Sequence, residues 1–168
     1  MMIVFDAVAL IHLAKLTILE KVCTIDIMLI PELVHQEVLE GKKKGYPDVP
    51  IMLDLIEKKK IIVKKTEASK VKKLLQFNVQ GGEAEAIILY QQENARWLVT
   101  DDDNVRKKAV ILDIRVIGTP SLIIHVYKKN LITKEKTVQS IRELQKIGWL
   151  SQAVIDQLHD EVEKWEKQ

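Results

Sequence analysis

Short apolar runs rich in β-branched residues alternate along this chain with longer segments of helical periodicity, and this alternation constrains the fold more than any other pattern in the sequence. The apolar runs occupy residues 2–5, 27–30, 61–64, 97–100 and 115–118. The helical patterns occupy residues 9–16, 18–22, 31–41, 67–77, 103–112 and 119–130. Continuous apolar strands separated by amphipathic helices are typical of a parallel sheet covered on both faces. The sequence therefore predicts an α/β fold with three layers, α/β/α, around a central, mainly parallel sheet of four to five strands.

The chain has the size and the apolar content of one domain. Its 168 residues, 47% of them hydrophobic, can form a single well-packed core, and we expect one domain over residues 1–168. Residues 41–50 are expected to be a surface loop, and residues 133–168 a helical tail with a break near "GWL". Apolar residues recur in this tail at helical spacing, which indicates contact with the core or with a second copy of the chain, at Val138, Ile141, Leu144 and Ile147.

The overall charge is nearly balanced, with 26 Lys and Arg against 24 Asp and Glu, so the net charge of +2 does not by itself indicate nucleic acid binding. A single cysteine, Cys23, excludes an intramolecular disulfide and suits a reducing compartment. The N-terminus lacks the pattern of a secretion signal, and no apolar run approaches the ~18 residues of a membrane span. We expect a soluble, cytoplasmic protein without a membrane partner.

Three aspartates directly follow two of the predicted strands. Asp6 follows residues 2–5, and Asp101 and Asp102 follow Thr100 at the end of residues 97–100. Ligands of open α/β sheets bind outside the carboxyl ends of the strands, so these side chains are candidates for one site. Helix capping is the alternative, because Asp is a preferred N-cap residue.

Two predicted helices add glutamates. On a helical wheel of residues 32–40, Glu37 lies within the arc of Leu33, Val34 and Val38, which face the core. In "GGEAEAIILY", Glu83 shares a face with apolar residues and is the better inward-facing acid, with Glu85 in reserve.

Carboxylates gathered at one end of a sheet repel one another and lose hydration together, and a divalent cation removes this penalty. Ligation by carboxylate oxygens alone suits Mg²⁺ or Mn²⁺. The four histidines and Cys23 show no close paired spacing, so we expect no zinc site.

The residues that carry these acids resemble a known family. The segments "IVFDAVALIHLAK", "IPELVHQEVLEG", "GGEAEAIILYQQENARWLVTDDDNVRKKA" and "VIGTPSLIIHVYKKNLI" together are similar to the PIN-domain ribonucleases, which include the VapC-type toxins of toxin–antitoxin pairs. The resemblance covers nearly the whole chain. It is greatest to a prokaryotic subgroup that has a Gly-Glu-Ala-Glu-Ala-Ile helix and an Asp-Asp pair after the fourth strand.

The resemblance implies a metal-dependent endoribonuclease, a homodimer, in which a metal-activated water hydrolyses RNA and which an antitoxin protein can accompany. Carried over by position, it implies that Mg²⁺ or Mn²⁺ is bound by Asp6, Glu37, Glu83 and Asp102, with Asp101 as a further ligand or support and Glu85 as the reserve for Glu83. Thr100 or a second metal ion would help to stabilise the charge that develops on the phosphate.

Two basic clusters are candidates for binding phosphates of the RNA. Arg106, Lys107 and Lys108 follow the acids directly, and Lys42, Lys43 and Lys44 lie in the predicted loop. Solvated surface lysines are the alternative interpretation. Val8 stands where many family members have Ser or Asn, so a catalytically weak or inactive RNA-binding or partner-binding module remains the alternative function, and a purely structural scaffold a third.

Overall fold

The computed structural model describes residues 1–70, 81–148 and 150–166. The strands are β1 Met2–Phe5, β2 Ile27–Pro31, β3 Ile61–Lys64, β4 Trp97–Val99 and β5 Val116–Ile117. The helices of the described residues are α1 Ala7–Lys15, α2 Leu19–Val22, α3 Glu32–Lys43, α4 Val49–Glu57, α6 Gly81–Gln92, α7 Asp103–Ile111, α8 Thr119–Lys128, α9 Lys134–Ile147 and α10 Gln152–Glu166.

The five strands form one sheet in the order β3-β2-β1-β4-β5, and every pair is parallel. Val4 of β1 is paired with Leu29 of β2 on one side and Leu98 of β4 on the other. The chain builds outward from β1 to β3 and then crosses to the opposite side of β1 to place β4. The boundary between β1 and β4 is therefore the switch point of the sheet, where open α/β folds bind their ligands.

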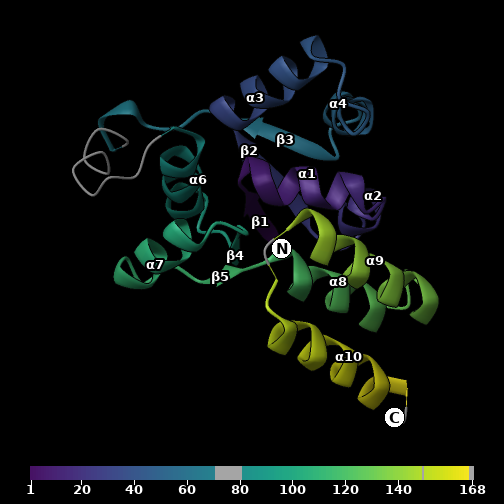
Figure 1. Cartoon of the computed structure of the whole chain (residues 1–168). Coiled ribbons are helices and arrows are strands. Elements are labelled where there is room, and N and C mark those ends of the chain that lie inside the picture. The colour runs from purple at the N-terminus through teal and green to yellow at the C-terminus, as the bar shows by residue number, and fades with distance from the viewer. Residues whose placement is uncertain (71–80, 149, 167–168) are drawn as a thin grey trace.

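Alternate residues of the strands face two separate apolar clusters, as the pleat of a strand requires. Ile3 and Phe5 pack with α1, α4 and α8, together with the buried residues of α9 and α10. Val4 and Leu98 pack with α6 and α7 on the opposite face. Figure 1 shows α6 and α7 on one side of the strands and α1, α8 and α9 on the other. This three-layer arrangement confirms the fold class predicted from the sequence.

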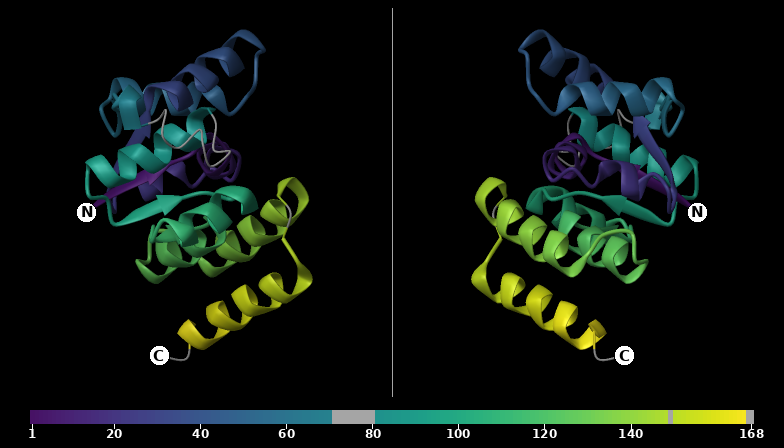
Figure 2. Two further views of the ribbon diagram at one scale, coloured as in Figure 1. Left: turned by 90° about the vertical axis from the view of Figure 1, so that its left-hand side faces the viewer. Right: turned by 90° about the vertical axis from the view of Figure 1, so that its right-hand side faces the viewer.

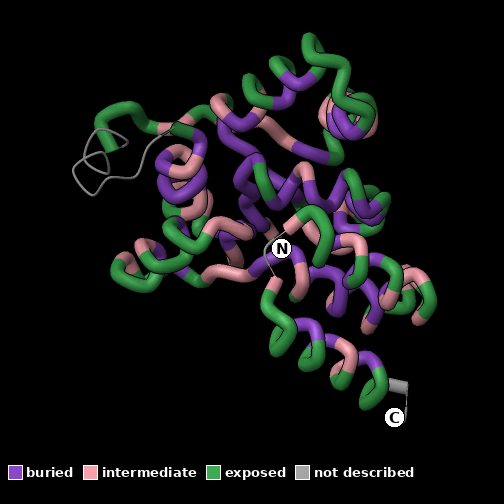
Figure 3. The backbone as a smooth tube through the Cα atoms, viewed as in Figure 1, coloured by how far each residue is buried: buried purple, intermediate pink, exposed green. Residues whose placement is uncertain are grey.

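The C-terminal part consists of two helices, which confirms the predicted break near "GWL". Within α9, Ile141 and Leu144 are buried, whereas Val138 is half-buried and Ile147 is exposed. Helix α10 packs against α8 and α9 with one apolar side, and its other sides face solvent (Figures 2 and 3).

The segment between β2 and β3 differs from the prediction. Residues 41–50 are not one loop, because α3 continues through Lys43 and α4 begins at Val49. The missed helix α4 has a proline in its first turn, a favoured position, and buries Val49, Met52 and Leu55. The helix predicted at residues 67–77 falls largely outside the described residues. Among the described helices, none combines the length and the apolar character that a membrane crossing requires.

Candidate metal centre at the switch point of the sheet

Asp6 and Asp102 begin the helices that follow the two strands at the switch point. Both residues have extended backbones and are the N-cap residues of α1 and α7. The backbone N–H of Asp6 donates to the carbonyl of Val99 at 3.1 Å, so the pairing of β1 with β4 extends to Asp6 itself. Two segments almost a hundred positions apart in the sequence thus place a carboxylate at the same edge of the sheet.

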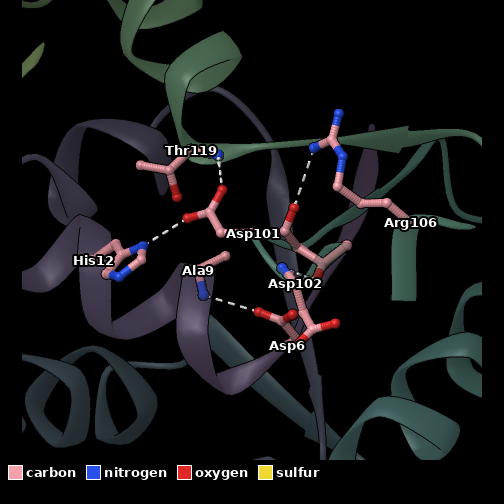
Figure 4. A network of polar contacts seen from close by, with 8 residues as sticks. Asp6, Ala9, His12, Asp101, Asp102, Arg106 and Thr119 are labelled. Atoms are coloured by element: carbon pink, nitrogen blue, oxygen red, sulfur yellow. Dashed lines mark hydrogen bonds and ion pairs between the residues drawn. The ribbon is translucent and has the colours of Figure 1, made fainter. Parts of the chain in front are cut away.

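Each cap uses a single carboxylate oxygen. Asp6 Oδ1 accepts from Ala9 N at 2.8 Å (Figure 4). Asp102 Oδ1 accepts from Asn104 N at 2.7 Å and Val105 N at 3.0 Å. Capping and ligand binding are therefore compatible at these residues, since a cap leaves the second oxygen of the carboxylate for another partner.

Thr100 links the two aspartates. It is fully buried, its hydroxyl oxygen accepts from Asp102 N at 3.1 Å, and it hydrogen-bonds to the carboxylate of Asp6. The hydroxyl hydrogen and one lone pair are thus both used within the site. In this position Thr100 orients carboxylates.

The carboxylate of Asp6 is the most deeply buried acid of the site. Burial raises its pKa from the ordinary 3.8 to about 7, and the charges of Asp101 and Asp102 act in the same direction, against hydrogen bonds from Thr100 and Ala9. Burial and the neighbouring acids therefore disfavour the ionised form of Asp6.

Glu37 of α3 and Glu83 of α6 extend the acidic region. Glu83 is half-buried, whereas Glu37 is exposed and does not face the core as its helical wheel predicted. Partial burial raises the pKa of Glu37, as do the charges of Glu40 and Glu83. Partial burial also raises the pKa of Glu83, and the charge of Asp102 adds to this. Charge repulsion thus links Asp6 to Asp102, Asp102 to Glu83, and Glu83 to Glu37. We call these four residues the acid pole.

Gly82 permits the close approach of α6 to α3. A Cβ at this buried position would lie 2.9 Å from Glu37 Oε1 and 3.2 Å from Val34 Cγ2. The absence of a side chain at Gly82 therefore leaves room for the carboxylate of Glu37. Glu85 has a different contact: its Oε2 accepts from Leu33 N at 3.1 Å, in the first turn of α3. Glu83 is directed to the acid pole and Glu85 to the end of a helix.

Asp101 contacts another set of residues. Its Oδ2 lies 2.6 Å from His12 Nδ1, and its Oδ1 accepts from Thr119 N at 2.7 Å. Burial acts to raise the pKa of Asp101, but the hydrogen bonds from His12 and Thr119 outweigh it and the pKa is lowered. We call His12, Asp101 and Thr119 the clamp. Figure 4 shows that Asp101 points toward the clamp residues, whereas Asp102 lies beside Asp6.

The sequence reasoning did not find the clamp. It considered His12 only as a zinc ligand, and it did not select Thr119. A polar side chain within the apolar helix of residues 9–16 was the available signal, but its partner is 89 residues away in the sequence.

The two basic clusters lie in different places. Arg106 Nη1 donates to the carbonyl of Thr100 at 3.4 Å, and the charge of Lys108 reaches Glu83, so both border the acid pole, and Lys107 is exposed on the same helix. Lys42 and Lys43 are exposed in the last turn of α3, followed by Lys44, away from the strand ends (Figure 1).

A cleft of about 890 Å³ opens beside the acid pole. It runs from Asp102 and Arg106 along α8 to α10, and His12 and the exposed Val8 line it. Its wall combines polar groups with apolar side chains of α8, α9 and α10, namely Ile124, Leu144, Ile147, Val154 and Leu158.

The donor chemistry of the acid pole fits a hard divalent cation, because its side chains offer oxygen ligands whose charges repel one another. Within residues 1–70, 81–148 and 150–166, no three His, Cys, Asp or Glu side chains are drawn together as a formed metal site. The acids of the acid pole border one region, but their side chains are not arranged around one common metal position.

Comparison with protein families identifies this chain's family. The family model described as "DUF3368: PIN domain" matches residues 2–164. The structure is also similar to a chain in the crystal structure of VapBC2 from Rickettsia felis bound to a DNA fragment from their promoter, with 17% sequence identity, 70% of this chain and 98% of that chain covered, and a TM-score of 0.48. Among curated proteins, none matches.

Proposed function

The chain belongs to the PIN-domain family, and on that premise we propose that it is a metal-dependent endoribonuclease that hydrolyses RNA phosphodiester bonds. PIN domains are typically nucleases that bind divalent metal ions. The observation that carries the proposal is the buried carboxylate of Asp6, with a pKa of about 7, beside Asp102 at the switch point of the sheet. Asp6 also caps α1, but its hydrogen bonds do not offset the cost of burying its charge beside Asp101 and Asp102, whereas a bound cation would.

Asp6, Asp102, Glu83 and Glu37 would hold Mg²⁺ or Mn²⁺. When bound, the cation supplies positive charge that activates water and stabilises the charge developing on the phosphate. The protein supplies the orientation of the ligands: the caps of α1 and α7 fix one oxygen each of Asp6 and Asp102, and Thr100 fixes the pair relative to each other.

Arg106, Lys107 and Lys108 would bind phosphates next to the cleaved bond, since they lie on the helix that Asp102 begins. The cleft beside the acid pole offers room for the adjoining nucleotides. Phosphate binding of this kind weakens as salt increases, by a slope of roughly 0.7 per contact for a single strand.

The function is tested with purified protein and single-stranded RNA under Mn²⁺ or Mg²⁺, with a chelator as the blank. Asp6→Asn and Asp102→Asn should each lower the cleavage rate at least ~100-fold, because a neutral amide replaces a ligand while Asn preserves the helix cap. Asp103→Asn is the matched control, since Asp103 is exposed in the first turn of α7 and outside the acid pole. Equal cleavage by Asp6→Asn and the native chain would reject the proposal.

The phosphate contacts have a matched control as well. Replacing Arg106, Lys107 and Lys108 by Gln should weaken RNA binding and flatten its salt dependence. Replacing Lys58, Lys59 and Lys60 by Gln removes the same charge just before β3, at the opposite edge of the sheet, and should leave the salt slope unchanged. A similar loss in both triple variants would reject specific phosphate contacts by α7.

A catalytically weak RNA-binding or partner-binding module is the second candidate, and Val8 favours it. This side chain is exposed and lines the cleft where many family members have a hydroxyl or amide. Raised thermal stability in Mn²⁺ without RNA cleavage would support the module. Raised stability together with cleavage would support the nuclease.

The family resemblance also implies protein partners, a second copy of the chain and an antitoxin. Light scattering of the purified protein tests the homodimer. Co-expression with the product of the neighbouring reading frame, followed by co-purification and inhibition of cleavage, tests the antitoxin.

A further inference from the structure

Asp101 and Asp102 are neighbours in the sequence, but their carboxylates have different partners. Asp102 caps its own helix with one oxygen. Asp101 uses both oxygens, one with His12 of α1 and one with Thr119 of α8. Its side chain is about 15% exposed and that of His12 about 11%, so water competes little for these bonds.

The contact to Thr119 replaces a missing helix cap. The N-cap residue of α8 is Gly118, which has no side chain to accept from the first turn. Asp101 reaches this turn from the end of β4 and accepts the N–H of Thr119. The absence of a side chain at Gly118 makes the approach feasible, because a Cβ there would lie 3.0 Å from Asp101 Oδ1 and 3.0 Å from Arg106 Nη1.

The contact to His12 fixes the same loop from the other side. His12 lies in the last turn of α1, the helix that Asp6 begins. Asp101 therefore ties the helix of Asp6 to the loop that carries Asp102, across 89 positions of the sequence. An acid with both oxygens engaged in this way has less capacity for a cation than Asp102, whose hydrogen bonds from the backbone of α7 use Oδ1 alone.

We propose that His12 and Asp101 are positioning residues: through the clamp they hold the loop of Asp102 in register with Asp6, and Asp101 is not itself a metal ligand. This inference rests on the proposed function, because the register matters for the cation that Asp6 and Asp102 would share. In this proposal Asp102 binds the cation and Asp101 positions the loop that carries Asp102.

Mn²⁺ affinity of the RNA-free protein tests the proposal, measured by electron paramagnetic resonance titration at fixed pH. Asp101→Asn keeps both contacts, since its amide oxygen can accept from Thr119 N and its amide nitrogen can donate to His12. It should retain Mn²⁺ affinity within a few fold, the remaining loss reflecting the removed charge. Asp101→Ala and His12→Ala break the clamp and should weaken Mn²⁺ binding ~10-fold, as changes to groups that orient metal ligands commonly do.

Two further variants separate positioning from general stability. His12→Gln offers a side-chain amide to Asp101 and should recover part of the affinity lost in His12→Ala. Ile11→Ala removes a half-buried apolar side chain from the adjacent position of α1 and should lower the thermal midpoint without changing Mn²⁺ affinity. The double variant His12→Ala/Asp101→Ala should bind Mn²⁺ no more weakly than either single variant, because both break one network.

The outcomes distinguish the clamp from the nuclease. If Asp101→Asn loses Mn²⁺ affinity as completely as Asp102→Asn, Asp101 is a ligand and the proposal is wrong. If His12→Ala binds Mn²⁺ like the native chain, or loses no more Mn²⁺ affinity than Ile11→Ala, the positioning role is wrong while the proposed function stands. If the native chain binds no Mn²⁺, the metal-dependent function fails first and the clamp has no ligand to position.

Discussion

The acid pole and the clamp lie next to each other, yet their carboxylates respond to burial in opposite ways. Asp6 is buried among other acids and its pKa is raised to about 7, whereas Asp101 is buried against hydrogen-bond donors and its pKa is lowered. Both are aspartates that follow a strand of the same sheet. The difference shows that the partners of a buried acid, and not its burial alone, decide whether it is satisfied within the protein or ready for a cation.

The largest expected effect that tests this comparison is the pH dependence of stability. Folded Asp6 binds its proton more tightly than unfolded Asp6, so its contribution is complete below pH 3.8 and is lost as the pH rises to about 7. At roughly 1.4 kcal/mol per unit, this amounts to about 4 kcal/mol. Urea unfolding in chelator should show that the native chain loses this stability between pH 4 and 8 relative to Asp6→Asn, whose cap is preserved.

If the stability of the native chain and that of Asp6→Asn depend on pH in the same way, Asp6 does not differ from Asp101 in its response to burial. The contrast with Asp101 is sharpened if Mn²⁺ restores the stability of the native chain at pH 8 and leaves that of Asp6→Asn unchanged.

A smaller effect is expected at Thr100, which joins the two aspartates of the acid pole. Thr100→Val preserves the shape but leaves Asp102 N without its acceptor, and it should cost about 1–3 kcal/mol of unfolding free energy. It should also weaken Mn²⁺ binding, because Asp6 loses its hydroxyl donor. Urea unfolding and Mn²⁺ titration measure the two effects.

Thr137→Val is the matched control for Thr100. Thr137 is also buried, and its hydroxyl donates to Thr133 O at 2.8 Å in α9, away from the acids. This variant should lose stability without losing Mn²⁺ affinity. Equal Mn²⁺ binding by the two valine variants would mean that Thr100 has only a structural role.

The smallest effect is expected from the two glutamates of α6. Glu83→Gln should weaken Mn²⁺ binding by about 1 kcal/mol or more, since a ligand loses its charge. Glu85→Gln should change Mn²⁺ affinity little and cost only about 0.5 kcal/mol of stability, because its amide oxygen still accepts from Leu33 N while the favourable charge at the start of α3 is lost. Equal losses of Mn²⁺ affinity would mean that both glutamates serve the metal.

The fold could be predicted from the sequence because the patterns that indicate it lie within short, continuous segments. Each buried strand is a continuous apolar run that can be read in place, and the aspartates at the strand ends follow from the polarity of a parallel sheet. The preference for Glu83 over Glu85 stays a prediction: both side chains are half-buried, and they differ in that Glu83 interacts with the charge of Asp102 while Glu85 accepts from Leu33 N. Helix α4 was missed where Asp48 and Pro50 were interpreted as loop residues, although proline also favours the first turn of a helix.

The sequence by itself determined the parallel sheet and the positions of Asp6 and Asp102 at its carboxyl edge, because these depend on periodicity and on the order of the strands. The helical wheel placed Glu37 on the core side, but the structure leaves Glu37 exposed, because a long side chain near the rim of a helix face can extend to solvent. Only the tertiary structure decided that Asp101 faces His12 and Thr119 while Asp102 faces Asp6. The physical reason is that a hydrogen bond depends on where two side chains meet in space, and the partners of Asp101 come from helices that lie far from it along the chain.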